Sequence, residues 1–192
     1  GSRGWAEFYA DDGPLFLRIG NVDEENVGLD LRDAQHVKPP VGAEGQRTRV
    51  RVGDVLVSIT ALIGAVAVVR EDLGEAYVNQ HLALTRPKKN SISSVWLGYT
   101  LAARTGKAQV EALMSGGTKV GLGLDDIRCL WFCSPPRQEQ ERIAAWLDDA
   151  IGRIREMICK IESQASLLRE YRQALISAAV TGKIEIPAEE AA

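Results

Sequence analysis

The chain has 192 residues, and its 23 Lys and Arg against 26 Asp and Glu give a formal net charge of −3. With 45% hydrophobic and 26% charged residues, the composition is that of a globular protein and excludes a disordered one. No apolar run approaches the roughly 18 residues that a membrane-spanning helix needs, so no membrane partner is expected.

The net charge of −3 is unevenly distributed, and the middle of the chain is basic. Residues 1–31 carry two basic against seven acidic side chains, whereas residues 32–119 carry twelve basic against seven acidic ones, a balance of +5. The last nine residues add three Glu. Because the local field governs the binding of a polyanion, the negative total does not exclude a nucleic-acid partner.

Residues 1–134 predict an α+β domain with a twisted, mostly antiparallel or mixed sheet and small helices. Apolar and β-branched runs predict strands at residues 15–19, 48–52, 55–60, 63–70, 76–85 and 127–133. Helical patterns cover residues 93–104 and 107–114, and a glycine-rich loop follows at 115–119.

The three cysteines, Cys129, Cys133 and Cys159, are too few for a zinc site and odd in number. Two of them flank a Leu-Trp-Phe run that is typical of a buried strand. We therefore expect small buried side chains in a reducing compartment, and hence a cytoplasmic protein.

A proline pair at 135–136 precedes a predicted helix of unusual length. From there to about residue 180 the chain has no proline and one glycine, which corresponds to a helix about 65 Å long. Its apolar positions alternate at spacings of three and four, as in a coiled coil. A helix packed along the globular domain is the alternative, but such a length would overhang that domain. The two seams are Leu147, Ile154, Ile161, Leu168 and Leu175, and Ile151, Ile158, Ala165, Arg172 and Ala179.

Motifs for catalysis or cofactor binding are missing from the sequence. It contains no phosphate-binding loop, dinucleotide fingerprint or amino-methyltransferase motif. His36 and His81 have no recognisable Ser or Cys partner motif, and Asp125 and Asp126 are more typical of a turn before a strand than of a metal pair. We expect a non-catalytic protein without cofactor or metal.

An ordered series of motifs resembles the specificity (S) subunit of type I restriction–modification systems. The motifs are GSRGWAEF at 1–8, FLRIGN at 16–21, GDVLVSITALIG at 53–64, AYVNQHLAL at 76–84, SGGTKVGLGLDDI at 115–127, PPRQEQERIAAWLD at 135–148 and LISAAVTGKIEI at 175–186. The resemblance implies a target recognition domain at 1–134 that recognises double-stranded DNA, a conserved coiled-coil spacer helix at 135–183 and an acidic tail at 184–192.

The resemblance also implies partners. Such a subunit directs methylation and cleavage by a modification (methyltransferase) subunit and, through the complex, a restriction subunit. The usual subunit has two recognition domain–helix repeats and this sequence has one, so we expect a half-subunit or a C-terminal fragment. Antiparallel pairing of two helices would give a homodimer with two half-sites about two turns of B-DNA apart. The expected interface is Leu147, Ile151, Ile154, Ile158, Ile161, Ala165, Leu168 and Leu175.

Candidate DNA contacts come mainly from the basic middle segment. Arg47, Arg49 and Arg51 alternate and should share one face of a strand, where arginine can bind phosphate or a guanine edge. A solvated strand face is the alternative interpretation.

Two polar segments extend the candidate set. The loop at 115–119 offers backbone N–H groups, a hydroxyl and an ammonium for a phosphate. Asn79 and Gln80 can pair with adenine edges, but Asn79 and His81 share a face and can equally hold a turn together. The full set is Arg3, Arg18, Asn21, Arg47, Arg49, Arg51, Thr60, Asn79, Gln80, Ser115, Thr118 and Lys119.

Two other functions compete with DNA recognition. The first is a protein-interaction scaffold that does not bind DNA and dimerises through the coiled coil. The second is an enzyme that uses Asp125 and Asp126, which the missing catalytic motifs disfavour. Salt-dependent binding to duplex DNA separates the scaffold from the DNA-binding protein.

Overall fold

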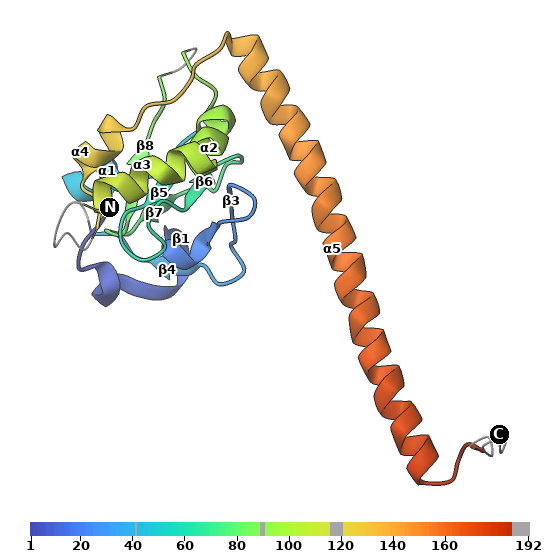
Figure 1. The fold of residues 1–192 in the computed structure, drawn as a ribbon. Helices are drawn as coiled ribbons and strands as arrows, with labels where there is room; N and C mark the ends of the chain where they lie inside the picture. The colour runs from blue at the N-terminus through green and yellow to red at the C-terminus, as the bar shows by residue number, and fades with distance from the viewer. Residues whose placement is uncertain (41, 89–90, 116–120, 186–192) are drawn as a thin grey trace. The chain divides into compact units, whose positions relative to one another are not determined.

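The computed structural model describes residues 1–40, 42–88, 91–115 and 121–185, and Figure 1 shows their fold. The chain forms two compact units, Gly1–Ala145 and Trp146–Ala192. Strands and short helices belong to the first unit, whereas the second holds most of one long helix. Among the described residues, no helix is both long and apolar enough to cross a membrane.

The first sheet of the N-terminal unit mixes parallel and antiparallel pairing. β1 (Tyr9–Leu17) lies between β4 (Gln35–Val37), to which it is antiparallel, and β7 (Ala76–Val78), to which it is parallel. A separate short ribbon pairs β2 (Val22–Asp23) with β3 (Gly28–Leu29). The predicted α+β class with mixed pairing is therefore confirmed.

The second sheet is centred on β5 (Val55–Ser58), which lies antiparallel between β6 (Val66–Val68) and β8 (Leu82–Thr85). Every residue of β5 is buried. Leu56 packs into one core cluster, and Val55 and Val57 pack into another that includes side chains of α2. Because both faces of β5 are covered, its sequence is continuously apolar instead of alternating.

An aromatic cluster fills the space beside the first sheet. Trp5, in the 3₁₀ helix η1 (Trp5–Phe8), stacks on Phe16 at 5.6 Å between ring centroids and meets Tyr77 at 5.3 Å. A second 3₁₀ turn, η2 (Ile19–Asn21), follows β1. Trp5 and Phe16 are each 2% exposed, so this cluster ties the N-terminus to β1 and β7.

Two of the predicted helices are present as α2 (Ser94–Ala102) and α3 (Arg104–Met114). The break between them falls at Ala103, whose backbone is extended, and not at Gly106 as expected. Gly106 is instead buried in α3, where a Cβ would lie 2.1 Å from the Leu101 carbonyl oxygen. This glycine therefore permits the close approach of the two helices.

Two predicted strands are wrong in their boundaries. Residues 48–52 follow α1 (Ala43–Thr48) and contribute only an isolated bridge between Arg49 and Tyr77. Residues 76–85 are two strands, β7 and β8, separated at positions 79–81. In the first case the alternating run begins at the end of α1 and pairs with another strand of the described chain at one bridge only. The second error arises because polar residues break the strand without glycine or proline.

The predicted strand at 127–133 is wrong. The segment begins within α4 (Leu124–Cys129), where Asp126 accepts a hydrogen bond from the Gly123 N–H (2.5 Å) and Asp125 pairs with Arg128 (2.7 Å). These carboxylates lie in the first turn of α4, where the positive end of the helix dipole favours negative charge. No cluster of potential metal ligands occurs among the residues that the structure describes.

The predicted burial of the cysteines is also wrong. Cys129, Cys133 and Cys159 are exposed, and Trp131 beside them is 73% exposed. The segment after α4 forms no strand in the described structure, but its side chains Leu130 and Phe132 are partly buried against the core cluster that includes residues of β5 and β6.

The long helix is confirmed as α5 (Arg137–Val180), with 44 residues. Its first turns belong to the N-terminal unit, where Gln140 is 1% exposed. The side-chain oxygen Oε1 of Gln140 accepts a hydrogen bond from the Ser93 N–H (2.8 Å). Its side-chain nitrogen Nε2 donates to Pro135 O (2.8 Å) and Ser134 Oγ (3.3 Å). At the other end, Gly182 has φ 67°, the left-handed conformation typical of a glycine that follows the C-terminus of a helix.

Candidate nucleic-acid interface

The turn between β7 and β8 gathers several of the predicted DNA contacts. Asn79 accepts a hydrogen bond from the His81 N–H through Oδ1 (3.1 Å). His81 Nδ1 lies 2.9 Å from Thr60 Oγ1, and His81 Nε2 lies 2.9 Å from Gln80 Nε2. We call Arg3, Thr60, Asn79, Gln80 and His81 the turn cluster.

The hydrogen bonds of His81 fix its ring proton. An amide nitrogen can only donate, so Gln80 Nε2 donates to His81 Nε2, and Nδ1 then carries the proton that is donated to Thr60. This arrangement leaves the Thr60 hydroxyl as a donor and the Gln80 carbonyl oxygen as an acceptor. Neither has another partner in the described part of the chain, and both types of group can pair with base edges.

The N-terminal residues place Arg3 beside this turn. Ser2 is fully buried; its N–H donates to Val78 O (2.9 Å), and it forms a parallel bridge with Asn79. Its hydroxyl donates to Thr48 Oγ1 (2.8 Å) at the end of α1. Two exposed arginines, Arg3 and Arg47, are thereby fixed next to residues of one polar network.

Residues 121 and 122 lie beside Ile59, next to Thr60 of the turn cluster. The Leu122 N–H donates to Ile59 O (2.9 Å), and a Cβ on Gly121 would lie 2.5 Å from that oxygen. Thr118 and Lys119 lie outside the described residues. Ser115 caps α3, and its hydroxyl donates to Glu111 O (2.7 Å), so this hydroxyl already serves the helix.

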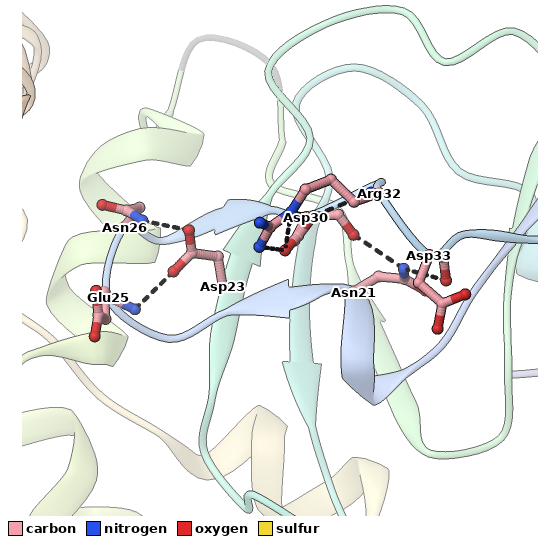
Figure 2. A network of polar contacts seen from close by, with 7 residues as sticks. All are labelled: Asn21, Asp23, Glu25, Asn26, Asp30, Arg32 and Asp33. Atoms are coloured by element: carbon pink, nitrogen blue, oxygen red, sulfur yellow. Dashed lines mark hydrogen bonds and ion pairs between the residues drawn. The ribbon is translucent and has the colours of Figure 1, made fainter. Parts of the chain in front are cut away.

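Asn21 lies in a different, acidic region, shown in Figure 2, and Arg18 directly precedes the 3₁₀ turn η2 that contains it. Asn21 is 2% exposed, and its amide donates to the carbonyl oxygens of Asp30 (2.9 Å) and Asp33 (3.3 Å). Its Oδ1 accepts from the Arg18 N–H (2.9 Å), and Arg18 Nη2 lies 3.9 Å from Asp33 Oδ2. Asn21 therefore stabilises the conformation of the segment that carries these acids. Its contact with DNA stays a prediction.

Acidic side chains dominate the rest of this segment. Asp23 accepts hydrogen bonds from the Glu25 N–H (3.0 Å) and from the Asn26 amide. The Arg32 guanidinium, hydrogen-bonded to Asp30, lowers the pKa of that carboxyl to about 2. Residues 18–33 carry five acidic against two basic side chains, and this net negative charge repels phosphate, so the turn cluster is the stronger candidate for a DNA contact.

The alternating arginines do not share one strand face, contrary to expectation. Arg47 belongs to α1, Arg49 pairs with Tyr77 through an isolated bridge, and Arg51 begins a turn in which its N–H donates to Asp54 (2.8 Å). The helix ends at Thr48 and removes the two-residue periodicity on which the expectation rested.

Arg51 instead lines a pocket with three cations that the sequence analysis did not select. These are Arg86, Lys88 and Arg137. Together with Arg51 they come from three parts of the chain, at positions 51, 86–88 and 137, so only the fold brings them together. A basic residue directly after a strand, as at Arg86, is a weak local signal that sequence alone would not distinguish from a solvated charge.

Comparison with known proteins identifies a protein family that the sequence matches. The model described as "Type I restriction modification DNA specificity domain" matches residues 43–163. The type I restriction enzyme EcoBI specificity subunit of Escherichia coli is 20% identical over 173 residues, covering 90% of this chain and 36% of that protein.

Two solved structures share the fold. One, described as the structural basis of complex assembly and conformational transition of the type I R-M system, has a TM-score of 0.67 at 22% identity, covering 91% of this chain and 40% of the other. The crystal structure of the HsdS subunit from Thermoanaerobacter tengcongensis gives 0.65 at 18% identity, with 93% and 44% covered. The chain thus spans less than half the length of each of these relatives.

Proposed function

Because the chain belongs to the family of type I restriction–modification DNA specificity domains, we propose that it recognises a specific sequence in double-stranded DNA. The turn cluster is the observation that carries this proposal. It presents a hydroxyl donor on Thr60 and an amide acceptor on Gln80, both held by His81. Groups of this kind discriminate base pairs through the major groove.

The residues of the turn cluster have different roles in this proposal. Gln80 and Thr60 contact base edges. Asn79 is 8% exposed, and it positions the turn through its bond to the His81 N–H. Arg3 and Arg47 are exposed and bind phosphates, which gives affinity and orientation without sequence preference.

The long helix sets the distance between two half-sites in this proposal. Apolar seam positions remain exposed along α5; for example Ile161 is 63% and Leu168 67% exposed. Such a seam is a liability in water unless a second helix covers it. Antiparallel pairing of two copies would separate their recognition units by about 65 Å, roughly two turns of B-DNA.

Methylation and cleavage are assigned to other chains. We infer that residues 1–134 form the recognition domain, 135–183 the spacer helix and 184–192 an acidic tail, and that this chain has no catalytic role. A modification subunit docks on it and carries out methylation, and a restriction subunit joins through that complex. The family membership supports this division of labour.

The proposal predicts salt-dependent binding to duplex DNA. In fluorescence anisotropy with a labelled duplex, log K should fall linearly with log salt concentration, with a slope of about −0.9 for each phosphate contacted. A protein-interaction scaffold would show no such binding. A chain that leaves the anisotropy of duplex DNA unchanged at low salt would refute DNA recognition and favour the scaffold.

A further inference from the structure

A basic pocket lies at the opposite end of the second sheet from the turn cluster. It has a volume of about 790 Å³, and its charged lining residues are Arg51, Arg86, Lys88 and Arg137. Arg51 precedes β5 and Arg86 follows β8, whereas the turn cluster adjoins the far ends of these strands, where Ser58 opposes Leu82. The pocket is therefore separate from the candidate base-contacting residues.

The pocket carries an excess of positive charge. The Arg86 guanidinium forms two hydrogen bonds with the Asp54 carboxylate (both 2.7 Å), and Arg137 pairs with Glu141 (2.6 Å). Within the described ranges, the side chains of Arg51 and Lys88 form no ion pair, and no acidic side chain lines the pocket. Two positive charges thus remain without a counter-charge.

The walls of the pocket are held in place by hydrogen bonds. Ser94, the first residue of α2, donates to Gly53 O (2.6 Å), and Arg86 donates to Arg49 O (3.1 Å). The pairing with Asp54 raises the pKa of Arg86 above its ordinary value, so this charge is permanent. Both α2 and α5 begin at the pocket, and the positive ends of their dipoles add to the field.

We propose that this pocket binds phosphate groups of the DNA backbone and so provides a sequence-independent anchor for the duplex that the turn cluster recognises. Arginine forks fit phosphate oxygens in a bidentate way. Gly53 and Thr60 lie seven positions apart, at most about 25 Å even in an extended chain, which is less than one turn of B-DNA, about 34 Å. One duplex can therefore reach both places. The proposal rests on the proposed function.

Removal of the two unpaired cations tests the proposal. In the R51A/K88A variant, affinity for every duplex should fall and the salt slope should become shallower by about 2, since two phosphate contacts are lost. The ratio between preferred and scrambled duplexes should stay unchanged. The control variant K160A/R169A removes two exposed charges from α5 and should keep the original slope, as should R51K/K88R.

The outcomes separate the two proposals. If the unaltered protein binds a preferred duplex but R51A/K88A keeps its slope, the anchor is refuted and the proposed function stands. If the unaltered protein binds no duplex, both are refuted. Thermal unfolding with inorganic pyrophosphate at constant ionic strength tests the other source of phosphate: stabilisation that R51A/K88A loses, together with an unchanged duplex slope, would mean a free-phosphate site and would overturn the backbone assignment.

Discussion

At the scale of single residues, hydrogen bonds decide which polar side chains can face a duplex. The sequence shows no Ser or Cys partner motif for His81, and the structure gives it contacts with both Thr60 and Gln80. The sequence predicts Asn79 and Gln80 as DNA contacts, with Asn79 and His81 as turn residues in the alternative interpretation, and all three occupy the turn itself. Contacts across 21 positions, as between Thr60 and His81, have no local signature in a sequence.

Ionisation of Tyr77 is expected to lower the stability of the N-terminal unit at high pH. Burial, with the hydrogen bond to Glu75 as a second cause, raises the pKa of Tyr77 from 10.0 to about 12. A raised pKa favours the neutral phenol in the folded state, so its stabilisation is complete below pH 10 and disappears as the pH rises toward 12. Near pH 12 the loss amounts to about 2 kcal/mol.

The Y77F variant isolates this effect. Urea unfolding at pH 8 and at pH 11.5 should show a larger decrease in the free energy of unfolding for the unaltered protein than for Y77F, because phenylalanine does not titrate. Parallel decreases in the two proteins would show that Tyr77 does not ionise more readily in the unfolded chain.

At the scale of elements, the long helix could be predicted because its signals are local. A proline pair precedes α5 and Gly182 follows it. The strands were harder, since the break at 79–81 has no glycine or proline, and the apolar run at 127–133 belongs partly to α4. Apolar composition alone does not distinguish a buried strand from an exposed segment when its packing partners lie far along the chain.

Gln140 anchors the start of α5 to α2, and we expect its removal to destabilise the N-terminal unit. In Q140A the buried Ser93 N–H loses its acceptor, which costs about 1–3 kcal/mol. Chemical denaturation followed by circular dichroism measures this difference. Gln138 lies in the same turn and is exposed, so Q138A should change the stability by less than about 0.5 kcal/mol. Equal effects of the two substitutions would contradict this stabilising role of the Gln140 side chain.

At the scale of the whole molecule, the resemblance found in the sequence and the family match agree on what kind of protein this is. The candidate site was harder to predict. Four cations between positions 51 and 137 form one pocket, and no spacing rule connects them. Conversely, Arg18 and Asn21 lie within the FLRIGN motif at 16–21, yet they belong to an acidic segment.

Selection from a pool of randomised duplexes tests the central claim most directly. Duplexes retained by the protein would be sequenced after several rounds, with binding at moderate salt to limit non-specific contacts. We expect an enriched motif of two identical half-sites in inverted orientation, separated by a spacer of constant length. A retained pool with the same sequence composition as the starting pool would contradict sequence-specific recognition.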